Sequence, residues 1–282
     1  MGTNECSGSH RSAGFNYALD NSSREAPARF DALSGIYDRG TIRHLEDRGV
    51  SERWHCLEVG GGGGSITAWL ANRVGPKGRV LVTDIDPRFL QSLSAKNVEV
   101  RRHNIVTDQL PEAAFDLIHA RLVLIHVPER EQVLARLVAA LKPGGWLVDE
   151  DFDSASLLPD STVSPGEVFL ETQKAVMRIL QDRGVERRWG RMLFGKMRAL
   201  GLVDVNAEAR MSMWHSGSPG ALLLRANFEQ LRGALIERNH VTEQQFDDDL
   251  ARLDDPDFMT PSPIMWTAWG RRPSAWEPTA SE

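Results

Sequence analysis

The chain has 282 residues, 41% of them hydrophobic, enough to bury the core of one large α/β domain with additions or of one domain and a small lobe. Its formal net charge is −6, so the chain has no general excess of positive charge, which argues against nucleic acid as a partner. Its two cysteines form no disulfide framework or paired zinc site, and no apolar run reaches the roughly 18 residues of a membrane helix, so we expect a cytoplasmic protein without a metal or a membrane partner.

The N-terminal region is divided by composition. Residues 1–24 are rich in Gly, Ser and Asn and predict a flexible segment. Phe15, Tyr17 and Leu19 are apolar exceptions that would dock over a pocket, so this segment is a candidate lid. From Glu25 onward, apolar residues recur at helical spacing, and Gly40 predicts a break between two helices.

Short β-rich runs alternate with helical stretches up to residue 153. This alternation predicts βαβ units and a parallel sheet, and we expect residues 25–153 to form the core. The expected strands are 56–59, 80–83, 98–101, 115–119 and 146–148, and two expected helices carry apolar stripes over 66–74 and 133–141.

The alternation stops after residue 153. We expect helices over 165–183, 189–200, 221–238 and 243–253, and strands over 203–213 and 264–269. Residues 154–282 then supply the remaining core strands and inserted helices that cap a ligand crevice. The predicted fold is a Rossmann-like, seven-stranded, mostly parallel sheet with helices on both faces and capping helices from the N-terminal and C-terminal regions.

A glycine-rich turn is the most informative segment. Glycines occupy positions 60–64, between an expected strand that contains Glu58 and an expected helix, so a ligand can approach the backbone closely. The dinucleotide fingerprint fails, because its third glycine falls on Ser65 or Ile66. Glu58 would also repel a pyrophosphate, whereas it would attract a ligand with an ammonium and a sulfonium centre.

Asp84 ends the second expected strand, about 20 residues after the last glycine, where an acid that binds ribose hydroxyls usually stands. The alternative is a turn or helix-capping role. For Asp86, which precedes Pro87, the capping role is preferable. We therefore expect a ribose-bearing ligand at Asp84.

Residues 52–151 resemble the class I S-adenosylmethionine-dependent methyltransferases. Their pattern Glu/Asp-x-Gly-x-Gly-x-Gly is matched by Glu58, Gly60, Gly62 and Gly64, and the segments 115–121 and 141–146 fit the family's fourth strand and its turn into the fifth. The resemblance implies S-adenosyl-L-methionine as cofactor. It implies cofactor contacts from Glu58, Gly60, Gly61, Gly62, Gly64, Asp84, Asn104, Ile105, Ala120 and Arg121, with Asn104 standing where Asp is commoner and Ile105 offering its backbone amide to the adenine.

Methyl transfer from a sulfonium needs chiefly alignment in a dry site, and a general base only for a hydroxyl or an unactivated carbon acid. His126 and Asp151 are the candidate catalytic residues. The alternative for His126 is a turn residue without a chemical role, and the alternative for Asp151 is a solvated loop acid. Arg121 would hold the cofactor or an anionic acceptor, or pair with Asp116. Other candidates near the crevice mouth are Glu150, Asp153 and His215.

The expected activity is methylation of carbon, oxygen or nitrogen in a small organic molecule such as a secondary metabolite. After the fourth strand the chain lacks the Asn/Asp-Pro-Pro-aromatic element of enzymes that methylate DNA bases. An S-adenosylmethionine-binding regulator or a cyclase is the alternative, and a nicotinamide-dependent oxidoreductase is disfavoured by the failed fingerprint. The sequence leaves open whether the chain is a monomer, a homodimer or a larger oligomer.

Overall fold

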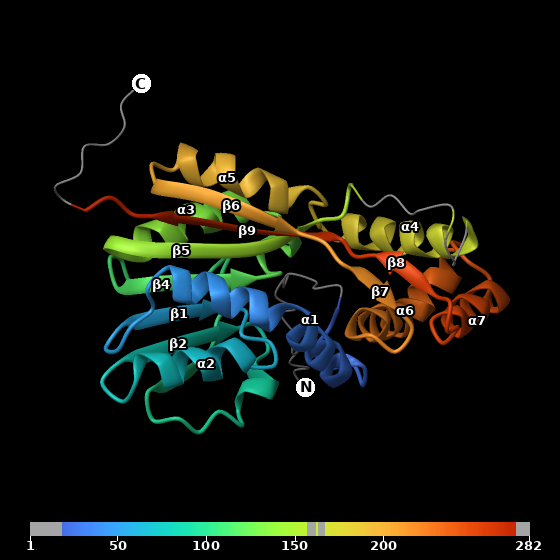
Figure 1. Cartoon of the computed structure of the whole chain (residues 1–282), viewed down its shortest axis with the longest axis horizontal. Coiled ribbons are helices and arrows are strands. Elements are labelled where there is room, and N and C mark those ends of the chain that lie inside the picture. Colours follow the sequence, from blue (N-terminus) through green and yellow to red (C-terminus); the bar gives the residue numbers. More distant parts are fainter. Residues whose placement is uncertain (1–18, 157–161, 163–166, 275–282) are drawn as a thin grey trace, which may run out of the picture.

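The computed structural model describes residues 19–156, 162 and 167–274 of the chain. Seven strands form one sheet in the order β3-β2-β1-β4-β5-β9-β6 (Figure 1). The strands are β1 (His55–Val59), β2 (Arg79–Asp84), β3 (Val98–Arg102), β4 (Phe115–Arg121), β5 (Leu141–Asp153), β6 (Val203–Arg210) and β9 (Ile264–Arg271). Only β9 runs antiparallel to its neighbours β5 and β6, so the predicted mostly parallel sheet is confirmed.

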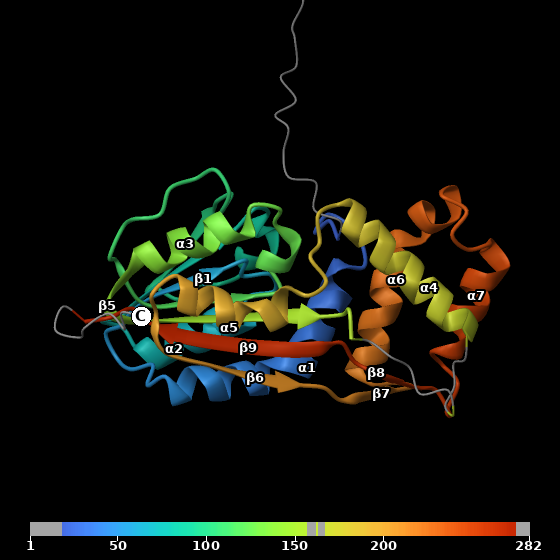
Figure 2. The same cartoon turned by 90° about the horizontal axis from the view of Figure 1, so that it is seen from above.

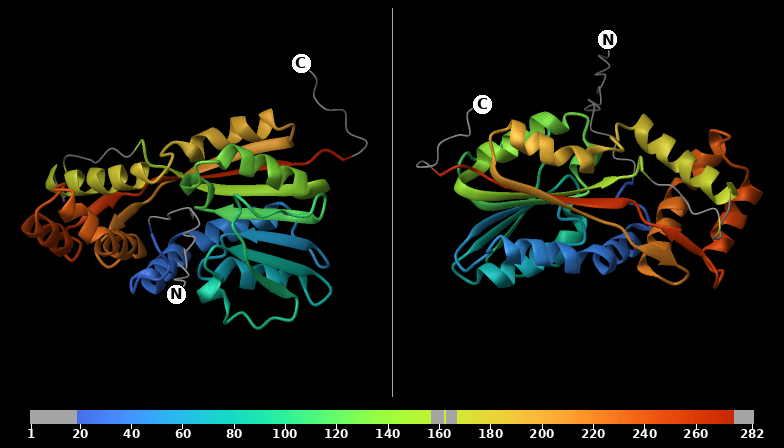
Figure 3. Two further views of the ribbon diagram at one scale, coloured as in Figure 1. Left: turned by 180° about the vertical axis from the view of Figure 1, so that it is seen from behind. Right: turned by 45° about the horizontal axis from the view of Figure 1, so that its top comes forward.

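Helices cover both faces of this sheet (Figure 3). The helices are α1 (Ala26–Asp47), α2 (Ser65–Val74), α3 (Arg130–Ala140), α4 (Glu167–Asp182), α5 (Trp189–Ala199), α6 (Pro219–Glu237) and α7 (Glu243–Arg252), with 3-10 turns η1 (Pro87–Leu90) and η2 (Leu124–His126). Apolar residues of α3 and α5 pack on one face, whereas those of α2 and the end of α1 pack on the other. Within the described residues, no helix is both long and apolar enough to cross a bilayer.

A cap lies beyond one end of the large sheet (Figures 1 and 2). It consists of α4, α6, α7 and a small antiparallel sheet of β7 (Met213–His215) and β8 (Met259–Pro261). Helix α6 also packs extensively along α1. The cap and the start of α1 therefore stand over the same end of the sheet.

Local chemistry explains where the cap helices begin. The Ser218 side chain accepts a hydrogen bond from the Ala221 amide ahead of α6, and Pro219 occupies its first turn. A capping box joins Thr242 and Gln245 at the start of α7. These signals are local, and the helices expected over 221–238 and 243–253 are found to within about two residues.

The predicted break at Gly40 is wrong, because α1 continues through it from Ala26 to Asp47. A Cβ atom at Gly40 would overlap the guanidinium of Arg210, so the glycine instead allows that side chain to cross the helix surface. The strand expected over 203–213 ends at Arg210, and Met213 begins the separate strand β7. Strand β5 begins at Leu141 rather than at Trp146, with an irregularity in its pairing to β4.

Candidate functional site

One cavity lies at the carboxyl ends of β1, β2 and β4, and it continues beneath the cap. Parallel sheets of this kind bind ligands at this edge, where the strand order reverses between β1 and β4. Eight of the ten predicted cofactor residues line the cavity: Glu58, Gly60, Gly61, Gly62, Asp84, Asn104, Ile105 and Arg121. Gly64 and Ala120 do not line it; Gly64 precedes α2 and Ala120 is buried within β4.

The glycine turn has a conformation and packing that side chains would disturb. Gly60 and Gly62 have φ values of +69° and +53°, in the left-handed region. A Cβ atom on Gly62 would lie 2.9 Å from the Phe30 ring, and one on Gly60 would overlap Val123. The turn therefore presents bare backbone to the cavity at the start of α2.

Asp84 is held in place at the end of β2 by backbone amides. Its Oδ2 accepts a hydrogen bond from the Gly62 amide at 3.1 Å, and its Oδ1 accepts one from the Asp86 amide at 2.9 Å. Burial raises the pKa of Asp84, and these hydrogen bonds oppose that rise. A carboxylate oriented in this way is suited to accept hydrogen bonds from two adjacent hydroxyl groups.

Asn104 lies after β3 and shapes its own turn. Its Oδ1 accepts a hydrogen bond from the Val106 amide at 3.0 Å, while its backbone amide donates to Asp108 at 2.9 Å. With Oδ1 engaged, the side-chain amino group of Asn104 is the part left to donate to a ligand.

A buried charged triad stands beneath the glycine turn. Nδ1 of His119 lies 2.7 Å from Glu58 Oε2, and its Nε2 lies 3.4 Å from Glu150 Oε2. All three residues are almost fully buried, and they come from adjacent strands β1, β4 and β5. Burial alone would lower the pKa of His119, but the carboxylates of Glu58 and Glu150 raise it to about 9. His119 is therefore an imidazolium at neutral pH and neutralises part of the two flanking charges.

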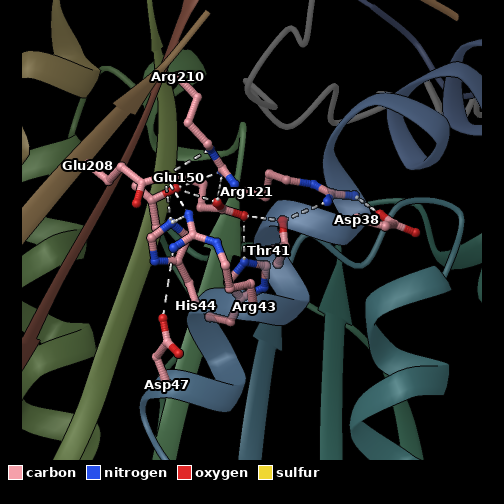
Figure 4. Close-up of polar contacts among 11 residues, drawn as sticks. Asp38, Thr41, Arg43, His44, Asp47, Arg121, Glu150, Glu208 and Arg210 are labelled. Carbon is pink, nitrogen blue, oxygen red and sulfur yellow. Dashed lines mark hydrogen bonds and ion pairs between the residues drawn. The ribbon is translucent and has the colours of Figure 1, made fainter.

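The triad continues from Glu150 toward α1 and β6 (Figure 4). Glu150 accepts hydrogen bonds from Thr41, Thr267 and Arg210, with the Arg210 contact at 2.7 Å. Arg121, at the end of β4, donates to Thr41 and to Asp38, each at 2.9 Å. Its guanidinium thus ties β4 to α1, and Asp116 pairs instead with Lys142.

His126, in η2, lines the cavity and is half-buried. Burial lowers the pKa of His126 to about 3, with smaller contributions from the nearby positive charges of Arg29 and Arg130. The ring is therefore neutral near pH 7. A base is most effective when its pKa lies near the working pH, so this ring is better suited to hydrogen bonding than to proton abstraction.

The predicted acids after the fifth strand have structural contacts. Asp151 is part of β5, is fully buried, and accepts a hydrogen bond from the Ile125 amide at 3.1 Å; it does not line the cavity. Asp153 pairs with Arg191. His215 is exposed on β7 and also lies outside the cavity lining.

The residues that precede α1 contribute to the cavity. Leu19 and Asn21 line it, while Phe15 and Tyr17 lie outside the described residues. The guanidinium of buried Arg29 donates to the Leu19 carbonyl at 2.8 Å, to Asn21 Oδ1 at 2.7 Å and to Gln230 of α6 at 2.8 Å. Arg29 was not predicted from the sequence as a residue of the site. The available signal was a positively charged residue on the apolar stripe of α1.

Comparisons with known proteins identify the domain around this site. Residues 57–147 match the family model described as a methyltransferase domain. Methyltransferase str2 of Strobilurus tenacellus is 31% identical over 169 residues, which are 59% of each chain. The ubiquinone/menaquinone biosynthesis C-methyltransferase UbiE of Enterobacter sp. (strain 638) is 28% identical over 145 residues, covering 47% of this chain and 58% of the relative. The chain thus spans less than two thirds of the length of these relatives.

Solved structures share the fold. A phosphoethanolamine N-methyltransferase of Haemonchus contortus has a TM-score of 0.59 at 12% identity, covering 91% of this chain and 60% of that one. The YcgJ protein of Bacillus subtilis has a TM-score of 0.54 at 12% identity, covering 85% of this chain and 100% of that one. The solved structures thus share the fold of this chain, and residues 57–147 match the model of a methyltransferase domain.

Proposed function

We propose that this protein transfers the methyl group of S-adenosyl-L-methionine to a small organic acceptor. The observation that carries the proposal is a single cavity, lined at one end by the glycine turn, Glu58 and Asp84 and at the other by apolar residues of α4 and α6. A methyl donor and its acceptor must meet in one space that excludes water, and this cavity provides such a space.

The residues at the strand ends fit this cofactor. The bare backbone of the glycine turn leaves room for close approach, and Asp84 would accept hydrogen bonds from the ribose hydroxyls. Glu58 would attract the ammonium group of the methionine part, because the Glu58 carboxylate lines the same cavity. Asn104 and the Ile105 backbone would hold the adenine. Arg121 lines the cavity beside them, with its guanidinium fixed by Asp38 and Thr41.

When bound, the sulfonium supplies an electrophilic methyl carbon: the acceptor's electron pair forms the new bond while the electrons of the carbon–sulfur bond pass to sulfur. The chain's own contribution is to align the two reactants and to exclude water. His126 would serve as a neutral hydrogen-bond partner of the acceptor. Asp151 is not proposed as a base, since its side chain is engaged away from the cavity.

The acceptor atom is carbon, oxygen or nitrogen. The named relatives include C-methyltransferases of quinone biosynthesis, and the Haemonchus contortus structure is a complex with phosphomonomethylethanolamine and S-adenosylhomocysteine. We further propose a cytoplasmic location, supported by the free, buried thiol of Cys56.

Turnover tests this proposal. The protein is incubated with methyl-labelled S-adenosylmethionine and a library of small aromatic and aliphatic acceptors, and S-adenosylhomocysteine and the labelled product are measured. The proposal predicts equimolar formation of both. The Asp84→Ala variant should lose turnover at low cofactor concentration, whereas Asp254→Ala, at an exposed acid, should not. Tight binding of the cofactor without labelled product from any acceptor would instead favour a regulatory or cyclase role.

A further inference from the structure

The cap end of the cavity is built from apolar stripes on two helices. Helix α4 contributes Val176, Met177 and Leu180, and α6 contributes Leu223, Leu224, Phe228 and Leu231. These residues recur at three-, four- and seven-residue spacing, so each helix presents one face to the cavity. An acceptor bound here would be surrounded mainly by hydrocarbon.

Two carboxamides interrupt these apolar faces. Gln173 precedes Val176 on the cavity face of α4, and Asn227 lies between Leu224 and Phe228 on that of α6; both line the cavity. The Gln173 residue is only 6% exposed. The side-chain oxygen of Asn227 is buried and has no hydrogen-bond partner among the described residues. A buried polar group without a partner is costly, so the Asn227 oxygen is positioned for a ligand, and Gln173 lines the same cavity.

The charged side chains near the cap end already have hydrogen-bond or ion-pair partners within the chain. The Arg29 guanidinium is bonded to Leu19, Asn21 and Gln230, and Asp153 is paired with Arg191. The other charged residues of the lining, Glu58, Asp84 and Arg121, belong to the strand ends where the cofactor would bind. A charged acceptor would therefore lose its hydration at the cap end, where the guanidinium of Arg29 already donates its hydrogen bonds to the chain.

We propose that the cap end of the cavity takes an electrically neutral, largely apolar acceptor whose hydroxyl or carbonyl oxygen is hydrogen-bonded by Gln173 and Asn227. A carboxamide both donates and accepts, so it serves either oxygen group. A chamber that hydrogen-bonds this oxygen rejects an analogue without it, because the amides are then left without partners. This inference rests on the proposed function, since it specifies the acceptor class of the same site.

Matched probes test the inference by calorimetry in the presence of saturating S-adenosylhomocysteine. The probes are para-hexylphenol, para-hexyltoluene, para-hexylbenzoate and para-hexylphenyltrimethylammonium, which share one apolar skeleton. We expect para-hexylphenol to bind most tightly and the two charged probes at least tenfold more weakly. Gln173→Leu and Asn227→Leu should each weaken phenol binding by about tenfold while leaving toluene binding equal or tighter.

Gln181→Leu is the matched control, because Gln181 lies exposed on the same helix and does not line the cavity. It should leave all four affinities unchanged. The inference is overturned if a charged probe binds as tightly as the phenol, if no probe binds, or if both cavity variants keep the wild-type phenol-to-toluene ratio. Failure of the proposed function would appear separately, as wild-type protein that does not bind S-adenosylhomocysteine in the preceding titration.

Discussion

Replacing His119 by Gln tests the buried triad beneath the glycine turn. The substitution removes the imidazolium that lies between Glu58 and Glu150. Glu150 keeps its contacts with Arg210, Thr41 and Thr267, whereas Glu58 loses the one side chain that pairs with its carboxylate among the described residues. The damage should therefore fall mainly on Glu58, which lines the cavity.

The size of the effect follows from the pKa of His119. A rise from 6.5 to about 9 corresponds to about 3 kcal/mol of folding free energy. Removing one partner of a buried pair costs about 3–5 kcal/mol, which agrees in magnitude. Because the folded-state pKa is the higher one, this contribution is fully present below the unfolded pKa of 6.5 and is lost as the pH rises through about 9.

Urea unfolding of wild type and His119→Gln between pH 6 and pH 10 measures this contribution. We expect the stability difference to be about 3 kcal/mol near pH 6 and to shrink by most of that amount above pH 9. Burial raises the pKa of Asp149 to about 7 and the charge of His119 opposes that rise, so part of any change in the stability difference near pH 7 comes from Asp149. His215→Gln, at an exposed histidine, should cost less than about 0.5 kcal/mol at any pH. A stability difference that stays constant from pH 6 to pH 10 would refute the assignment of a charged His119.

Three further substitutions have defined outcomes. Asp84→Ala should weaken S-adenosylhomocysteine binding about tenfold to a hundredfold by calorimetry, because charge-assisted hydrogen bonds are worth about 1.5–3 kcal/mol; unchanged affinity would remove Asp84 from the site. Gly62→Ala should lower the free energy of unfolding by about 1–2 kcal/mol, because residue 62 has a left-handed conformation that alanine disfavours. It should also weaken cofactor binding. A variant with wild-type stability and affinity would contradict the assigned turn. Gly40→Ala should destabilise the protein, because the added methyl group displaces Arg210 from Glu150, although helix propensity alone favours Ala by about 1 kcal/mol. Gly35→Ala, on the same helix without that overlap, is the control. A Gly40→Ala variant more stable than wild type would be inconsistent with the observed packing.

The sequence predicts the large sheet well, because its signals are local. Apolar strands that alternate with amphipathic helices are visible within short windows, and the glycine turn and Asp84 mark the carboxyl ends of β1 and β2. Eight of the ten expected cofactor residues consequently lie on one cavity, although their roles stay predictions.

Contacts between residues far apart in the chain could not be predicted from the sequence in the same way. A glycine such as Gly40 disfavours a helix locally, but its role here depends on Arg210, which belongs to the distant strand β6. Glu150 and Asp151 follow apolar residues and resemble the start of a loop, yet β5 continues through both and buries them. The Glu58–His119–Glu150 triad forms only when three strands align in register. Ionisable residues at buried positions of adjacent strands were the signal that could have revealed it.

The central claim is that the cavity binds S-adenosylmethionine. Calorimetric titration of the purified chain with S-adenosylmethionine, S-adenosylhomocysteine and NAD tests it most directly. We predict micromolar binding of the first two with about one site per chain, and no measurable binding of NAD. Binding of NAD without binding of the other two would contradict the account.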